Sequence, residues 1–408
     1  MLEFNHLLKN YQEGKTLPQD FYTDSNIFSE EMKRIYFKQW LMVDHISRIP
    51  NPGDYFVFDA EKESIIVIRG RDNEVRAFYN VCTHRGSRIC LDEEGSKKLL
   101  VCPYHAWSFS AEGELKAARF MPEDFKKEEW GLRECHLKIY EGLIFINLSD
   151  SSNNFEEFIS PTKKFIEFHG LSNAKIAHRQ YYPTKGNWKL TLDNFHECYH
   201  CQPSHPEYCQ VHDKDYIIAY GAGSNTGPAS EKFHKVLSEW NEKVKKMGHL
   251  TGEYSETEFN DYSRSAERTP LKEGMFTETK SGQPISKLMG KFTDYDCGYT
   301  SVGTSPFNSL LMCNDFATLF TFIPVSPLYT QVELMWLVHK DAEEGKDYNL
   351  DEMKWMWDVT TVADKRIIED NQKGVLSEKY VPGPLSEMEK GLEKFKSWYL
   401  KHLENSIT

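Results

Sequence analysis

The chain of 408 residues lacks two features that would assign a protein to a class at once. No apolar run approaches the roughly eighteen residues that a membrane-spanning helix needs, so we expect no membrane partner. Basic residues are in the minority, with 49 Lys and Arg against 62 Asp and Glu and a formal charge of −13. Because nucleic acid binding requires a basic surface that neutralises phosphates, this balance argues against a nucleic acid partner.

Signs of secretion are also missing. The nine cysteines are odd in number, are not spaced like a disulfide framework, and in several cases stand beside histidines. This usage indicates metal binding in a reducing compartment. The first residues, Met-Leu-Glu-Phe-Asn-His, have an acid where a signal peptide carries basic residues. A cytoplasmic location is the prediction.

What the chain does have is a change of pattern along its length. From 41 to about 150, short apolar stretches at 55–58, 64–69 and 75–79 alternate with turns rich in Gly, Pro, Asn and Asp. We predict a small all-β domain there. The polar run 149–154 is a candidate linker, and 408 residues suffice for two ordinary domains.

Residues 151–408 are predicted to form a larger α+β domain with an antiparallel sheet and long C-terminal helices, so the overall class is α+β. Residues 1–40, including a helix at 29–40 with Ser29 as its N-cap, are expected to pack on this larger domain. Stretches with little apolar periodicity are expected to be surface loops. The expected strands are 318–324 and 331–338, the helices 188–201 and 349–372, and the loops 221–227 and 250–284.

Two pairs of potential metal ligands stand in the all-β segment, Cys82 with His84 and Cys102 with His105. Each pair lies at a strand end, where a turn can aim both side chains at one centre. Two cysteines and two histidines could hold a tetrahedral zinc ion, although Cys-x-His is tighter than the usual zinc spacing. With the adjoining Arg-Gly-Ser and Ala-Trp-Ser, the pattern resembles the Rieske [2Fe–2S] domain. The resemblance implies that the cysteines bind one iron and the histidines the other.

A second group of candidate ligands begins with His200 and His205, which stand on either side of a proline expected to end the helix. Asp193, Glu197 and His200 lie at i, i+4 and i+7 and share one helical face, and we predict both acids to be catalytic. A zinc site built from the cysteines of this stretch is the competing interpretation. Cys198 projects about 160° away from His200 at about 100° per residue, so we interpret these cysteines as small packing residues.

The third ligand is expected from the helix at 349–372. Asn349 is its predicted N-cap and Gly374 its predicted stop. Asp364 is the only acid on its apolar face, and a buried acid needs a partner, which is either a basic side chain or a metal ion. Two histidines and one carboxylate form the facial triad of non-haem Fe(II) oxygenases. We therefore predict that His200, His205 and Asp364 bind one metal ion.

The motifs Asn-Trp-Lys at 187–189, Glu-Cys-Tyr-His at 197–200 and His-Pro-Glu at 205–207 resemble those of Rieske oxygenase α subunits. Asp364 with Gln372 and Gly374 resembles their C-terminal ligand region. The resemblance covers nearly the whole chain. It implies a mononuclear Fe(II) on the triad, and a Glu197 carboxylate that bridges to His84 or His105 of a neighbouring subunit in a head-to-tail homotrimer. The glutamate in Glu-Cys-Tyr-His-Cys is similar to the residue at this position in the branch of the family that oxidises quaternary ammonium compounds.

The function that this resemblance implies is a terminal monooxygenase that hydroxylates or N-demethylates a small compound of the glycine betaine kind. Electrons are expected from a separate NAD(P)H-dependent flavin and iron–sulfur reductase, since the chain has no Gly-x-Gly-x-x-Gly loop. The alternatives are an aromatic-ring hydroxylating dioxygenase α subunit and a choline or carnitine monooxygenase. A ferredoxin-like electron carrier would need only the first domain, and a zinc scaffold would be colourless.

Overall fold

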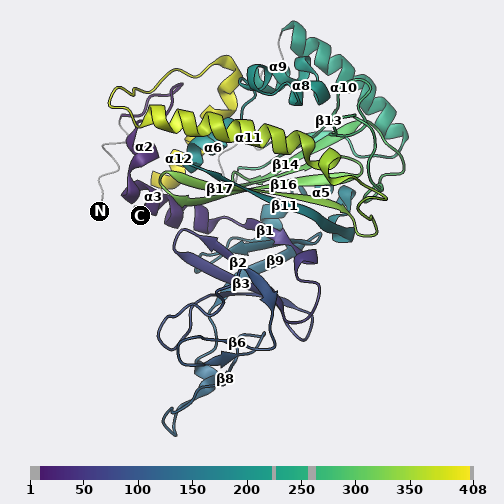
Figure 1. Ribbon diagram of the computed structural model, residues 1–408. Helices are drawn as coiled ribbons and strands as arrows, with labels where there is room; N and C mark the ends of the chain where they lie inside the picture. The colour runs from purple at the N-terminus through teal and green to yellow at the C-terminus, as the bar shows by residue number, and fades with distance from the viewer. Residues whose placement is uncertain (1–9, 223–226, 256–262, 405–408) are drawn as a thin grey trace. The chain divides into compact units, whose positions relative to one another are not determined.

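The computed structural model describes residues 10–222, 227–255 and 263–404 (Figure 1). Two compact units divide the chain: Trp40–Asn153 forms one, and the other described residues form the second. These limits lie within three residues of the expected domain limits. Both units contain antiparallel sheets, and the second adds long helices, so the predicted α+β class is confirmed. No described helix is long and apolar enough to cross a membrane.

The unit Trp40–Asn153 is all-β. A seven-stranded antiparallel sheet in the order β1-β10-β9-β4-β3-β2-β5 stands beside a small sheet of β6, β7 and β8. The indole Nε1 of Trp40 donates to the carbonyl oxygen of Asn153 at 2.9 Å, which joins the two ends of the unit. The strands are β1 (Leu41–His45), β2 (Asp54–Ala60), β3 (Glu63–Arg69), β4 (Val75–Tyr79), β5 (Glu94–Ser96), β6 (Leu100–Val101), β7 (Ser108–Phe109), β8 (Leu115–Ala117), β9 (Glu134–Tyr140) and β10 (Leu143–Asn147).

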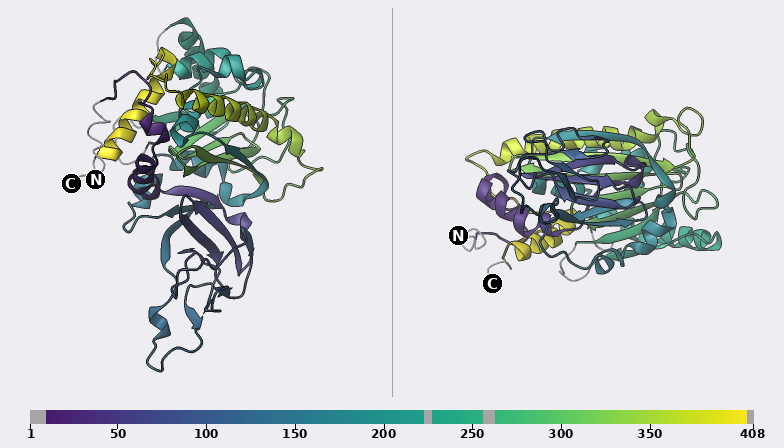
Figure 2. Two further views of the ribbon diagram at one scale, coloured as in Figure 1. Left: turned by 60° about the vertical axis from the view of Figure 1, so that its left-hand side comes forward. Right: turned by 90° about the horizontal axis from the view of Figure 1, so that it is seen from below.

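The larger unit is built on a second seven-stranded antiparallel sheet in the order β11-β17-β16-β15-β14-β13-β12. Helix α11 (Leu350–Val375) lies across one side of this sheet in both views, and packs on β11 and α6 (Figures 1 and 2). The strands are β11 (Ala174–Thr184), β12 (Gly252–Ser255), β13 (Ser265–Pro270), β14 (Gly298–Ser305), β15 (Asn308–Met312), β16 (Phe316–Ser326) and β17 (Tyr329–His339).

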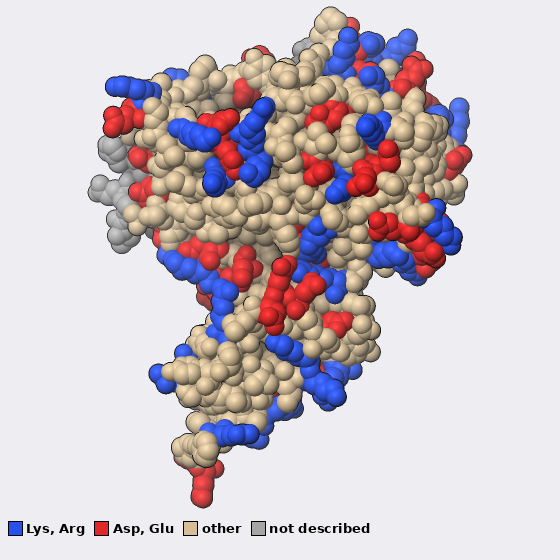
Figure 3. Space-filling view, in the orientation of Figure 1, with Lys and Arg blue, Asp and Glu red and all other residues tan. Residues whose placement is uncertain are grey.

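The helices of this unit position the site and the N-terminal segment. Helix α3 lies near the start of the chain and α12 near its end, and the two helices contact each other (Figure 2). On the face shown in Figure 3, acidic and basic side chains of the described residues are interspersed without a continuous basic area. The helices are α2 (Asp20–Thr23), α3 (Ser25–Arg34), α4 (Phe155–Ile159), α5 (Lys163–His169), α6 (Trp188–Phe195), α7 (Cys201–Ser204), α8 (Tyr208–Val211), α9 (Lys214–Ala222), α10 (Pro228–Lys246), α11 and α12 (Lys390–Glu404).

The N-terminal helix begins earlier than expected. Asp24, not Ser29, is the N-cap of α3, because its side chain accepts hydrogen bonds from the backbone N–H groups of Asn26 and Ile27. A carboxylate at this position satisfies donors that the first turn leaves free. The prediction for Ser29 was therefore wrong, and the helix ends at Arg34, where the prediction had it continue to residue 40.

The helix predicted at 188–201 was too long. Helix α6 ends at Phe195, and the Glu197 side chain then accepts from the backbone N–H groups of Tyr199 and His200. A side chain that accepts hydrogen bonds from nearby backbone N–H groups gives the backbone an alternative to a further turn of helix. The proline expected to end the helix lies inside the short α7, where the first turn tolerates it.

Two further boundaries differ from the predictions. Helix α11 continues through Gly374 to Val375, so this glycine does not end it. The predicted N-cap Asn349 does cap the helix, through Glu352 N–H. The expected loop 250–284 contains β12 and β13, which complete the sheet, and its residues 256–262 lie outside the described chain. Of the expected loop 221–227, residues 223–226 also lie outside it.

Candidate metal centres

The loops that carry Cys82 and Cys102 have the same backbone hydrogen bonds. Each cysteine N–H donates to the carbonyl five residues on, Ser87 and Trp107, at 2.8 Å. Each cysteine carbonyl accepts from the N–H four residues on, at 2.9 and 3.1 Å. The donors of the second pair of bonds, Gly86 and Ala106, both have positive φ. Two unrelated stretches of sequence thus form equivalent tight turns, each presenting one Cys and one His.

The four side chains meet as two pairs of like groups. The buried thiols of Cys82 and Cys102 lie within hydrogen-bonding reach of each other, and burial raises the pKa of Cys82. The His84 and His105 rings have centroids 4.7 Å apart, with His84 stacked on Trp107. Within the described chain, no three of these four groups bring their ligand atoms within 4.8 Å of one another. One tetrahedral zinc ion would require that convergence, whereas a two-iron cluster takes the thiols on one iron and the imidazoles on the other.

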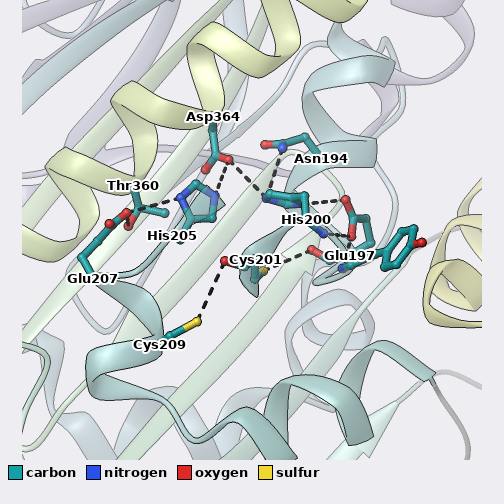
Figure 4. A network of polar contacts seen from close by, with 10 residues as sticks. Asn194, Glu197, His200, Cys201, His205, Glu207, Cys209, Thr360 and Asp364 are labelled. Atoms are coloured by element: carbon teal, nitrogen blue, oxygen red, sulfur yellow. Dashed lines mark hydrogen bonds and ion pairs between the residues drawn. The ribbon is translucent and has the colours of Figure 1, made fainter. Parts of the chain in front are cut away.

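The second centre is the predicted triad, and the structure brings its three members together (Figure 4). Their potential ligand atoms all lie within 4.8 Å of one another. Asp364 Oδ1 is 2.8 Å from His205 Nε2 and 3.2 Å from His200 Nε2. His200 directly precedes α7 and His205 directly follows it, while Asp364 comes from α11. One short helix therefore orients both imidazoles toward a carboxylate that is more than 150 residues away in sequence.

Each histidine has a carboxylate at its second nitrogen. Glu197 Oε1 is 2.5 Å from His200 Nδ1. Glu207 Oε1 lies 3.3 Å from the buried His205 Nδ1, and the same oxygen accepts from Thr360 Oγ1 at 3.1 Å. A carboxylate that accepts from the outer imidazole nitrogen, as Glu197 does, holds the ring orientation and increases the basicity of the ligating nitrogen. His205 Nδ1 has no hydrogen-bond partner among the described residues, so Glu207 is its neighbour at ion-pair distance only. The sequence motifs include both glutamates, but sequence spacing alone does not reveal the role of Glu207.

The pKa shifts fit a site for a cation. Burial lowers the pKa of His200, but the hydrogen bonds that its ring donates to Asp364 and Glu197 outweigh burial and raise the pKa to about 10. Burial raises the pKa of Asp364, and the two histidines lower it to below its usual value. A metal ion binds a neutral imidazole and an ionised carboxylate. Two neutral imidazoles and a carboxylate are the donor set that suits Fe(II).

Asp193 is the one predicted catalytic side chain that does not reach the triad in the described contacts. Its nearest basic partner is the buried Lys396, with Oδ2 and Nζ 3.4 Å apart. It does line the same cavity as Glu197 and His200. Asn194, which the sequence interpretation did not single out, contacts His200 Nε2 through its amide nitrogen at 3.2 Å. The roles of Asp193 and Glu197 in catalysis stay predictions.

The cysteines near the triad are not among its ligands in the described structure. Cys198 and Cys201 are buried, and Cys209 Sγ donates to the Cys201 carbonyl oxygen at 3.9 Å. The hydrogen bond with the neighbouring Cys198 thiol, followed by burial, raises the pKa of Cys201 strongly, which disfavours the thiolate that zinc would need. The chain therefore offers a Rieske cluster site and a mononuclear iron site as its two metal centres.

Comparison with known proteins agrees with these centres. Residues 39–140 match the model of the Rieske [2Fe–2S] domain, and residues 171–405 that of the ring hydroxylating alpha subunit catalytic domain. The glycine betaine monooxygenase oxygenase subunit of Pseudomonas aeruginosa is 35% identical over 98% of this chain and 92% of its own. The carnitine monooxygenase oxygenase subunit of Escherichia coli K12 is 38% identical, over 49% of this chain and 54% of its own.

Solved structures show the same architecture. A quaternary ammonium Rieske monooxygenase studied for carnitine oxidation has a TM-score of 0.72 at 25% identity, over 97% of this chain and 96% of that one. Naphthalene 1,2-dioxygenase from Rhodococcus, at 21% identity and a TM-score of 0.63, shares the fold. With two matched domain models, relatives over its full length and both metal centres formed, the chain belongs to the Rieske non-haem iron oxygenase α subunits and is a monooxygenase of that type.

Proposed function

We propose that this chain hydroxylates an N-methyl group of a small quaternary ammonium compound, with glycine betaine as the first candidate. The observation that carries the proposal is similarity over the full length. Glycine betaine monooxygenase oxygenase subunits of Pseudomonas aeruginosa and Chromohalobacter salexigens are 35% and 33% identical over 98% and 96% of this chain. In the sequence comparison the carnitine relatives match about half of it, whereas the solved structure of the enzyme studied for carnitine oxidation covers 97% of it at 25% identity.

The described residues support the chemistry of such a reaction. When bound, the iron would supply the chemistry that inserts an oxygen atom of O₂ into a C–H bond, with electrons from the cluster. The potential ligand atoms of His200, His205 and Asp364 lie within 4.8 Å of one another, and Glu197 contacts the second nitrogen of the His200 ring. A hydroxylated N-methyl group is a hemiaminal, which breaks down to the amine and formaldehyde. The product pair is therefore a demethylated amine and formaldehyde.

The partners follow from the same family relationship. As an oxygenase subunit, the chain works in a multi-component system with a reductase and as an assembly of subunits. We propose an NAD(P)H-dependent flavin and iron–sulfur reductase and a homotrimer in the cytoplasm. In this trimer Glu197 would contact a cluster histidine of the next subunit. The exposed His105 and the position of Glu197 at a cavity wall support this arrangement.

The test is formaldehyde release coupled to O₂ uptake. Purified, iron-loaded protein with a surrogate reductase is supplied with glycine betaine, choline, carnitine, proline betaine or a simple aromatic acid. We expect one formaldehyde for each O₂ with glycine betaine. A hydroxylated product without formaldehyde would contradict demethylation, and uptake with the aromatic acid alone would move the function to ring hydroxylation.

A further inference from the structure

The two loops that carry the ligands of the Rieske cluster are supported in different ways. The second loop (102–107) joins β6 to β7, and these two strands are paired, so a strand ladder closes its ends. The first loop (82–87) follows β4, and between β4 and β5 the described chain contains no strand. The ends of the first loop therefore have to be held together by something other than a ladder.

One side chain closes the first loop at its base. Asn80 lies just before the loop, and Ile89 and Cys90 lie just after it. The Asn80 Oδ1 accepts hydrogen bonds from the backbone N–H groups of Ile89 and Cys90, both at 2.9 Å. Its Nδ2 donates to the Cys90 carbonyl oxygen at 2.8 Å. The carboxamide thus supplies the donor and acceptor that a paired strand would offer to this backbone.

Asn80 also ties the base of the loop to the sheet. Its Nδ2 donates a second hydrogen bond, to Ser64 Oγ of β3 at 3.1 Å, and its backbone N–H donates to the Ser64 carbonyl oxygen at 2.8 Å. A carboxamide has two N–H donors and an oxygen with two lone pairs. The fully buried Asn80 side chain uses all four. Aspartate would lack the donors, and glutamine is one methylene longer.

The tip of the first loop is held by other groups. The His84 ring stacks on the buried Trp107 ring of the second loop, with centroids 4.7 Å apart and an interplanar angle of 14°. Thr83 Oγ1 donates to the Trp130 carbonyl oxygen at 2.8 Å. These contacts orient the imidazole end of the loop. Cys82 is the first residue of the loop, so its position depends on the base that Asn80 holds.

We propose that Asn80 is a positioning residue of the Rieske cluster, which holds the first ligand loop in a fixed place relative to the second. Asn80 acts through the backbone of the loop, since its described hydrogen bonds go to none of the four ligand side chains. The surroundings of the ligands tune an iron–sulfur cluster, so a loosened loop would change its electronic structure and ease the loss of iron. This role is independent of the substrate, because every turnover draws electrons from the cluster.

The test compares Asn80→Ala with wild type in the full-length, metal-loaded protein. The cluster is reduced with dithionite and observed by electron paramagnetic resonance. We expect a broader signal in the variant, because a loosened first loop holds its ligands in a range of geometries. We also expect iron loss to a chelator to be roughly tenfold faster, the effect of losing one or two net hydrogen bonds.

Asn147→Ala is the matched control. Asn147 ends β10 in the same unit and is as fully buried as Asn80, and its Oδ1 accepts from the Ser149 N–H at 3.0 Å. The control should lower the melting temperature but keep the wild-type spectrum and the wild-type rate of iron loss. A wild-type spectrum and rate in Asn80→Ala would overturn the proposed role, and so would equal changes in the two variants.

Asn80→Ser takes the place of the alanine variant if that variant does not fold. A serine hydroxyl can accept from one of the two backbone N–H groups but cannot make all four bonds, so the same changes should appear to a smaller degree. A folded serine variant with the spectrum and iron loss of wild type would overturn the role. None of these measurements uses a substrate, so their outcome does not depend on formaldehyde release.

Discussion

At the scale of single residues, the contacts of Asp364 distinguish a metal ligand from a partner in a salt bridge. Asp364 is mostly buried, and its described hydrogen bonds go to His200 and His205 rather than to Lys or Arg. A salt bridge was the competing role for an acid in an apolar stripe, and the geometry does not favour it. The ligand assignment can be tested by its effect on metal content.

Asp364→Ala is expected to lose the mononuclear iron and all turnover while keeping the visible spectrum of the Rieske cluster, because the cluster ligands lie in the other unit. Iron and acid-labile sulfide analysis measures this directly. Asp370→Ala is the control, since this acid of the same helix is largely exposed and pairs only with Lys373 in the described contacts. Full iron content and activity in Asp364→Ala would show that the ligand assignment is wrong.

Glu197→Gln tests the bridging carboxylate with little change of shape. The amide oxygen can still accept from His200 Nδ1, so both metals should stay bound. We expect turnover to fall at least about tenfold to a hundredfold, as for other changes behind metal-ligating histidines. The measurement is re-oxidation of a pre-reduced cluster during a single turnover. Wild-type re-oxidation with slow product formation would place the defect at the iron instead.

At the scale of elements, a buried hub holds α6 in place. Glu31 of α3 accepts hydrogen bonds from Trp188 Nε1 at 2.8 Å, Lys189 Nζ at 2.7 Å and Tyr399 OH at 2.5 Å. Lys189 is fully buried, and burial lowers its pKa. The hub joins α3, α6 and α12, so residues from both ends of the chain support the helix that leads into the triad.

Glu31→Ala is expected to destabilise the larger unit by about 3–5 kcal/mol, because it leaves the Lys189 ammonium buried and unpaired. Glu30→Ala, one residue earlier, removes only partly exposed ion pairs with Lys33 and Arg34 and should cost about 1 kcal/mol or less. Urea unfolding followed by fluorescence measures both. Equal stability of the two variants would show that the hub does not hold α6.

At the scale of the whole molecule, the two units are expected to fold separately. The unit Trp40–Asn153 has its own sheets and core, and its ends are joined by the bond between Trp40 and Asn153. A fragment of these residues should take up the cluster and show the Rieske absorption spectrum, but show no formaldehyde release. Colourless, unfolded fragment under conditions in which the full chain is loaded would contradict independent folding.

The sequence by itself determined the ligand types, the domain order and the family, because metal-binding motifs and strand–turn alternation are local patterns. It also singled out Asp364, which lies beside His200 and His205 in the structure, since a lone acid in an apolar helical stripe is visible in one dimension. The end of α6 could not be foreseen, because the Glu197 side chain bonds to the backbone of the following turn. The sequence included Glu207 in a motif without showing its role, and it did not single out Asn194. Their roles depend on contacts with α11 or on the angle of α7, and only the packing of distant segments decides those.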